Sequence, residues 1–212
     1  GQGGGRLQEY KTPAGRSTAE LTFKKSRFIA TVVPVCTEQQ AADFFSEIKK
    51  TYRDARHNVT AFLLKNGNLA RYSDDGEPHS TAGLPVFQAI GHFGLTNCAV
   101  TVTRYFGGVL LGTGGLVRAY FETACAGIAA GKILTVKPAT VLTGQCSYAD
   151  YAVLEPLLHR PGVQPIGADF AEQVNLRLVL QNNTLDDFLN LMTETFAGRL
   201  HFTEQEKIFY GF

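Results

Sequence analysis

Three polar segments of the sequence hold the residues that could do chemistry. The first runs from Asp54 to Asn58 and contains Arg56 and His57. A histidine beside a carboxylate can act as a general base whose ring the carboxylate orients. The same five residues also suit a solvated turn between a helix and a strand, because loops are hydrophilic by default. Both interpretations stay open from the residues alone.

The second segment, residues 73–83, holds three carboxylates and a histidine within six positions. Asp74, Asp75 and Glu77 could hold a hard cation through their oxygens, although the spacing does not fit an EF-hand. The Asp-Gly and Glu-Pro pairs in this segment are also ordinary turn sequences. If the protein were an enzyme, we would expect His57, Asp74 and Asp75 to be its catalytic residues.

The third segment, residues 104–118, places a glycine-rich stretch between a predicted strand and a predicted helix. Five glycines stand within residues 107–115, and Arg104 and Arg118 flank them. Glycines let backbone N–H groups approach an anion, and a helix N-terminus favours negative charge. The segment matches neither the P-loop nor the dinucleotide fingerprint, and close packing of a loop on a helix would also require glycine. We favour a surface that accepts an anion or a partner.

The sequence contains no complete catalytic constellation. It has no G-x-S-x-G elbow, no H-E-x-x-H motif and no cysteine beside a histidine. Cys36, Cys98, Cys125 and Cys146 include no C-x-x-C pair, which argues against a zinc ribbon. All four stand in apolar surroundings, so we expect buried, reduced thiols. We expect no metal and no cofactor.

The elements that position these segments come from a chain of 212 residues, enough for one large domain or two small ones. The composition, 44% hydrophobic and 18% charged, argues against a disordered chain. No apolar run is long enough to span a membrane and no signal peptide is visible, so we expect a cytoplasmic protein without a membrane partner.

The charge is divided unevenly along the chain. Residues 1–134 hold 15 Lys and Arg against 10 Asp and Glu, and residues 135–212 hold 5 against 9. The first part is therefore net +5 and the second net −4. This asymmetry favours polyanion binding by the first part alone, although two ordinary solvated surfaces would give the same numbers.

The hydrophobic pattern predicts alternating strands and helices in the first 134 residues. Strands are expected at residues 17–23, 27–35, 58–64, 69–73 and 98–105. Residues 24–26 are interpreted as the turn between the first two strands, and Asn66-Gly67 as a hairpin turn. Helices are expected at residues 38–52, behind a capping box of Thr37 and Gln40, and at 84–92 and 116–130.

Beyond Pro138, which we take as a domain boundary, the pattern is compact. Strands are expected at residues 141–148, 163–170, 174–180 and 199–210, and helices at 151–158 and 185–196. This βαββαβ order is the ferredoxin-like pattern. Pro156 conflicts with the first of these helices, because proline removes a backbone hydrogen bond.

Together the three polar segments resemble those of bacterial members of the IMPACT family. The similarity covers nearly the whole chain and is most specific in residues 104–120. It implies an α+β fold of two domains. Residues 6–134 would be like the second domain of ribosomal protein S5, and residues 139–212 would form a ferredoxin-like domain resembling one of translation elongation factor G. One departure is Asn58, where such sequences often have a second histidine, which weakens a two-histidine metal site.

The resemblance also links the chain to translation, because mammalian IMPACT is a translation regulator, but it supplies no settled activity for bacterial members. Our main hypothesis is a non-enzymatic protein that binds RNA or a ribosomal component through its first domain. One alternative is an enzyme acting on a phosphorylated small molecule, and another is a protein-interaction module. The sequence leaves the oligomeric state unknown.

We expect the three segments to converge on one face of the first domain, because sites gather where strands and helices end. That face would bring together Arg56, His57, Asp74, Asp75, Glu77, Arg104 and Arg118. The residues expected to bind nucleic acid or another anion are Lys24, Lys25, Arg27, Arg56, Arg104, Gly107, Gly108, Gly112, Gly114, Gly115 and Arg118.

Overall fold

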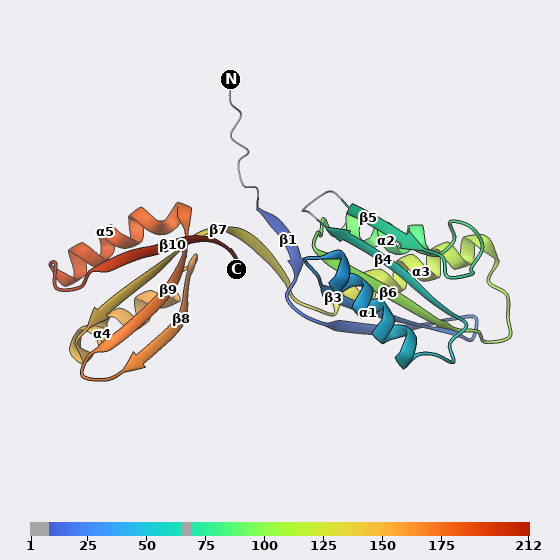
Figure 1. Cartoon of the computed structure of the whole chain (residues 1–212), viewed down its shortest axis with the longest axis horizontal. Helices are drawn as coiled ribbons and strands as arrows, with labels where there is room; N and C mark the ends of the chain where they lie inside the picture. Colours follow the sequence, from blue (N-terminus) through green and yellow to red (C-terminus); the bar gives the residue numbers. More distant parts are fainter. Residues whose placement is uncertain (1–8, 65–68) are drawn as a thin grey trace, which may run out of the picture. The chain divides into compact units, whose positions relative to one another are not determined.

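A computed structural model describes residues 9–64 and 69–212 (Figure 1). The chain divides into two compact units, one made of Tyr10–Leu134 and the other of Thr135–Phe212 with Glu9. Each unit has its own sheet and helices, and the α+β fold class with two domains is confirmed. None of the helices in the described residues is long and apolar enough to cross a membrane.

The first unit is built on one antiparallel sheet whose strands lie in the order β2-β3-β6-β4-β5. The central strand β6 is buried along almost its whole length, as its run of valine, alanine and threonine requires. The strands are β2 (Ser17–Phe23), β3 (Ser26–Pro34), β4 (His57–Leu64), β5 (Leu69–Ser73) and β6 (Cys98–Tyr105).

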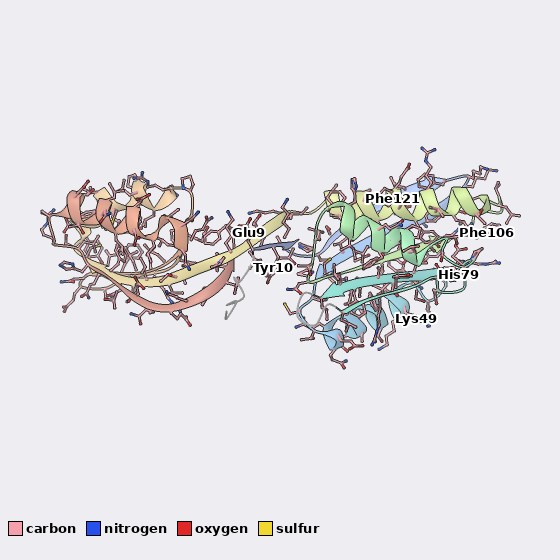
Figure 2. All side chains as sticks on the ribbon, turned by 90° about the horizontal axis from the view of Figure 1, so that it is seen from above. Glu9, Tyr10, Lys49, His79, Phe106 and Phe121 are labelled. Atoms are coloured by element: carbon pink, nitrogen blue, oxygen red, sulfur yellow. The ribbon has the colours of Figure 1, made fainter. Side chains whose placement is uncertain are left out.

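Helices cover both faces of this sheet. Helix α1 (Glu38–Thr51) packs on one face, around Phe44 and Ile48, and α2 (Gly83–His92) and α3 (Gly112–Ala129) pack on the other. Figure 2 shows Lys49 of α1 and Phe121 of α3 on opposite sides of the sheet. The Thr37 side chain accepts a hydrogen bond from the Gln40 N–H at the start of α1, as the capping box predicted.

The predicted elements of the first unit differ from the described structure at the start of α3 and at a short first strand. Helix α3 begins at Gly112 and not at residue 116, because the first turn of a helix needs no internal N–H partners and tolerates glycine there. A short strand, β1 (Tyr10–Pro13), was missed, since four residues are too few for a hydrophobic pattern. The predicted Asn66-Gly67 turn lies outside the described residues.

The second unit has the ferredoxin-like strand order β10-β7-β9-β8, all antiparallel. Its helices α4 (Tyr148–Leu154) and α5 (Leu185–Phe196) pack against one core with the leucines of β9. That core contains Leu176, Leu178 and Leu180, as the alternation in β9 predicted. The strands are β7 (Ile133–Cys146), β8 (Val163–Phe170), β9 (Val174–Gln181) and β10 (Phe202–Gly211).

The two prolines that the sequence singled out both lie within or beside regular structure. The chain divides between Leu134 and Thr135, close to the predicted boundary at Pro138, but strand β7 begins at Ile133 and not at residue 141, so it runs through Pro138. Pro138 is paired with Phe209 of β10 but lies one position beyond the Ala139–Gln181 pair that ends the ladder with β9, and proline is tolerated where a strand lacks a partner on one side. Pro156 lies at the second position of a separate 3-10 turn, Glu155–His159, after α4 has ended at Leu154, so no helical hydrogen bond is lost.

Candidate functional site

The antiparallel pairing brings the polar segments to one end of the first sheet. Arg104, near the end of β6, lies opposite Phe28 of β3 and His57 of β4. The Lys24-Lys25 turn, which precedes β3, therefore lies at the same end as the loop that follows β6. Figure 2 shows His79 and Phe106, from the second and third segments, at this end of the unit. We call this end of the first unit the basic end.

A pocket of about 360 Å³ opens at the basic end. Its polar wall is formed by Arg56, His57, Glu77 and Arg104, which come from all three predicted segments. Its apolar wall includes Phe106 and the leucines of the loop that leads into α3. Arg118 does not line the pocket; it lies one helical turn further on, in an exposed ion pair with Glu122.

Glu77 is the centre of a buried hydrogen-bond network beneath this pocket. Its Oε1 accepts from Arg104 Nη1 at 2.7 Å and from the Tyr120 hydroxyl at 2.7 Å. Burial, together with the Glu77 carboxylate, raises the pKa of Tyr120, so the hydroxyl stays a donor. Arg104 is thus engaged inside the protein, and the predicted direct phosphate contact from this residue does not fit its position.

Arg104 also holds the loop after β6. Its guanidinium carbon lies 5.6 Å from the centre of the Phe28 ring and 5.5 Å from that of Phe106. Ser26 Oγ lies 3.5 Å from Arg104 Nη2 and accepts a 3.2 Å hydrogen bond from the Gly107 N–H. The Nε of Arg104 is buried without a hydrogen-bond partner among the described residues. Arg104 is therefore a positioning residue for the turn before β3 and for the glycine-rich loop.

His57 has a defined tautomer. Its Nδ1 lies 2.7 Å from the backbone oxygen of Asp75, and because a carbonyl can only accept, Nδ1 carries the proton. Its Nε2 lies 3.6 Å from Glu77 Oε2. The predicted pairing of Asp54 with His57 is not formed, since the Asp54 carboxylate accepts from the Tyr105 hydroxyl at 2.9 Å.

Asp74 and Asp75 are occupied by backbone hydrogen bonds. The Asp74 carboxylate accepts from the N–H groups of Ser80, Ala82 and Gly83, at the start of α2, which has no side-chain cap of its own. Asp75 Oδ2 accepts from the Asn58 N–H at 2.7 Å. These bonds give both carboxylates a structural role. In the described part of the chain no group of three or more His, Cys, Asp or Glu side chains is arranged to hold a metal ion.

The predicted glycines serve different purposes. A Cβ on Gly107 would lie 2.1 Å from the carbonyl carbon and oxygen of Lys25, so this glycine lets the loop pack on the Lys24-Lys25 turn. Gly108 and Gly112 have φ of +82° and +75°, in the left-handed region. A Cβ on Gly114 would meet nothing within 4 Å, and Gly115 is merely close to Leu111.

The Lys24-Lys25 turn is backbone-strained. It is a two-residue connection between the paired residues Phe23 and Ser26, and its φ angles are 43° at Lys24 and 67° at Lys25. Positive φ at both central residues is the type I′ geometry, for which Asn-Gly is the favoured sequence. A non-glycine residue in this region costs about 1–2 kcal/mol.

The six cationic side chains that were predicted to bind an anion fall into two groups. Arg104 is paired with Glu77 in the interior, and Arg27 is paired with Glu20 at 2.7 Å and Arg118 with Glu122 at 2.6 Å, both on the surface. In contrast, no ion pair within residues 9–64 and 69–212 involves the remaining three cations, Lys24, Lys25 and Arg56. These three charges are free to meet an anion.

Two residues of the site were missed by the sequence reasoning. Tyr120 lies inside α3, where an aromatic at helical spacing indicates only a core position. Phe106 was quoted within its segment but given no role, although a large aromatic at the mouth of a glycine-rich loop is a signal of exposure. The expectation of four buried cysteines holds at Cys98 and Cys146 only. Cys36 is exposed, because it lies in the connection before α1, and Cys125 of α3 is partly buried.

Comparison with known proteins places this two-domain arrangement in a class. An Impact N-terminal domain matches residues 24–128, and a domain of unknown function, DUF1949, matches residues 145–199. The first match contains the Lys24-Lys25 turn and all three polar segments.

The chain belongs to the IMPACT family. It is 31% identical to the IMPACT family member YvyE of Bacillus subtilis, over 94% of this chain and 93% of that protein. It is 30% identical to the IMPACT family member YigZ of Escherichia coli K12, over 92% of this chain and 97% of that protein. A crystal structure of a hypothetical protein matches with a TM-score of 0.60 and 30% identity, covering 95% of this chain and 99% of that one.

Proposed function

We propose that this protein is a non-enzymatic RNA-binding protein with a role in translation, and that the basic end of its first unit binds RNA phosphates. The observation that carries the proposal is the Lys24-Lys25 turn. Two lysines occupy positive-φ positions that Asn-Gly would fill with less strain. Strained backbone clusters at functional sites, where it is retained for what the side chains do.

The surroundings of the turn favour an anionic partner. Lys24 and Lys25 are exposed, and the turn packs directly on the loop that leads into α3. The first turn of α3 has no side-chain cap, so its backbone N–H groups face the same end with partial positive charge. Arg56 adds a third free cation at the rim of the pocket.

The proposed phosphate contacts involve fewer residues than the sequence predicted for anion binding. Lys24, Lys25 and Arg56 supply the main phosphate contacts, and the exposed ion pairs of Arg27 and Arg118 can exchange their carboxylates for phosphates. Arg104 supports the loop from below. Phosphate contacts of this kind fix position without reading sequence.

The test is the salt dependence of binding between the whole chain and a single-stranded RNA, measured by fluorescence anisotropy. Three phosphate contacts predict that log K falls against log salt with a slope of about −2, from the single-strand coefficient of about 0.7 per contact. Arg56→Ala should reduce that slope by about 0.7. The matched control is Lys132→Ala, an exposed cation just beyond the opposite end of α3, which should leave the slope unchanged.

A second candidate, a protein-interaction module, is favoured by one observation. The loop and the first turns of α3 expose Val109 (40%), Leu110 (80%) and Val117 (38%) to solvent. Capture of partners from cell lysate with and without nuclease separates the two functions. Partners that survive nuclease treatment but are lost with Val109→Ser and Val117→Ser would favour the interaction module.

A further inference from the structure

Phe106 is left without a role by phosphate binding alone. It lies in the loop between β6 and α3, and 40% of its surface is exposed. Two guanidinium groups lie over its ring, Arg104 at 5.5 Å and Arg56 at 5.4 Å from the ring centre. An exposed aromatic ring among cations is the arrangement with which single-strand-binding proteins hold a base between phosphates.

The pocket beside Phe106 has the character of a base site. Phe106, Leu110, Leu111 and Leu116 form its apolar wall, and His57 and Glu77 lie on its polar wall. A nucleobase has two apolar faces and a polar edge, so it can meet both walls at once. Because Nδ1 of His57 is bonded to the backbone oxygen of Asp75, the ring nitrogen of His57 that remains for a hydrogen bond with a base is Nε2. This Nε2 lies 3.6 Å from Oε2 of Glu77.

Lys24, Lys25 and Arg56 lie close to Phe106, where they can contact the phosphates on either side of a base stacked on its ring. Gly107, the residue after Phe106, packs against the backbone of Lys25. Arg56 rests on the Phe106 ring but is itself exposed, so it can turn from the ring to a phosphate when a base takes its place. Stacking of a base on an aromatic ring contributes to binding in single-strand-binding proteins whatever the base, because every base has an apolar face.

We propose that this pocket binds one unpaired base of single-stranded RNA, stacked on Phe106, while Lys24, Lys25 and Arg56 hold the flanking phosphates. The inference rests on the proposed function and names its partner more closely. A base within a duplex is stacked and paired, so it cannot enter the pocket. The site therefore selects single strands or unpaired loops over double-stranded RNA.

The test uses the full chain and an RNA of about eight nucleotides that carries the fluorescent base 2-aminopurine, a length within the range of single-strand sites. Stacking on an aromatic ring quenches this fluorophore, and anisotropy of an end label reports binding separately. We expect the natural chain to bind and to quench. Phe106→Leu should bind about tenfold more weakly and lose the quenching. Phe106→Tyr should retain both.

The matched control is Phe209→Leu, which removes a ring of similar exposure, 37%, from the other unit and should change neither signal. Two results would overturn the base pocket and leave the proposed function intact. One is binding by the natural chain with the expected salt slope but without quenching, and the other is an RNA affinity of Phe106→Leu equal to that of the natural chain. Equal affinity for single- and double-stranded RNA would also overturn it. If the natural chain bound no RNA in the anisotropy measurement, that result would instead contradict the proposed function itself.

Discussion

Oε1 of Glu77 lies 2.7 Å from Nη1 of Arg104, and both side chains are almost completely buried, at 4% and 6% exposure. The two residues were expected to share an accessible surface, and they do line one pocket. Their charges, however, are turned toward each other and toward the core. This buried pair supports the loop and the turn that carry the exposed cations. Its contribution to the free energy of unfolding can be measured separately from RNA binding.

Breaking the pair should destabilise the first unit strongly. Glu77→Gln leaves the Arg104 guanidinium buried without its counter-charge, which costs about 3–5 kcal/mol. The double variant Glu77→Gln/Arg104→Gln should recover part of that loss, because no unpaired charge remains. Urea unfolding followed by circular dichroism measures both. Glu47→Gln, which breaks the exposed pair with Arg16, is the control and should have little effect; an equal effect of the two single variants would contradict the account.

Asp74→Ala should destabilise the start of α2. The carboxylate accepts three backbone N–H groups that no other side chain satisfies at this helix end, and loss of such a cap costs about 1–2 kcal/mol. Asp43→Ala, on the exposed surface of α1, is the matched control. Chemical denaturation in the presence and absence of Mg²⁺ gives a further check, since stabilisation of the natural chain by Mg²⁺ that vanishes in Asp74→Ala would instead indicate a cation site.

Two glycines of the same loop and helix should respond in opposite ways to alanine. Gly107→Ala places a Cβ against the backbone of Lys25 and should displace the Lys24-Lys25 turn, with a loss of stability and of RNA affinity. Gly114→Ala meets open space in the first turn of α3 and should stabilise the protein by up to about 1 kcal/mol. Thermal unfolding and RNA anisotropy of the two variants test the pair, and equal behaviour would show that the turn does not rest on Gly107.

The first unit should lose stability in alkali. Burial raises the pKa of Cys98 to about 12, against about 8.5 for an unfolded thiol. Between these values the unfolded state releases the proton and the folded state keeps it, so the free energy of unfolding falls as pH rises. From pH 8 to pH 10 this amounts to about 2 kcal/mol, at about 1.4 kcal/mol per pH unit above 8.5. Cys98→Ala should show a shallower decline in urea unfolding, and an unchanged slope would exclude Cys98 as its source.

The strands and helices followed from local patterns, so most of the fold could be predicted. The alternation in β2 and β9, the capping box before α1 and the apolar face of α5 each depend on residues close in sequence. The start of α3 was misplaced because glycines weaken a helical pattern without preventing the first turn. The start of β7 was placed too late, beyond Pro138, because the tolerance of a strand for this proline depends on where β9 stops.

The candidate site was predicted only as a set of segments. Spacing alone cannot tell that Arg104 points inward, because its burial depends on Glu77, Tyr120 and Phe28, which come from three other elements. The same holds for Asp74, whose hydrogen bonds become visible only once α2 is in place. The strain at Lys24 and Lys25 was also hidden, because a Lys-Lys-Ser turn does not reveal its φ angles.

The role of the basic end in RNA binding can be measured most simply in the double variant Lys24→Asn/Lys25→Gly. This change installs the favoured type I′ sequence and removes two proposed phosphate contacts at once. We expect the variant to be more stable by about 1 kcal/mol or more in urea unfolding, because the turn is no longer strained. We also expect it to bind RNA at least about tenfold more weakly at low salt, with a salt slope smaller by about 1.4. A variant that is stabilised yet binds RNA as tightly as the natural chain would contradict the claim that the basic end binds RNA.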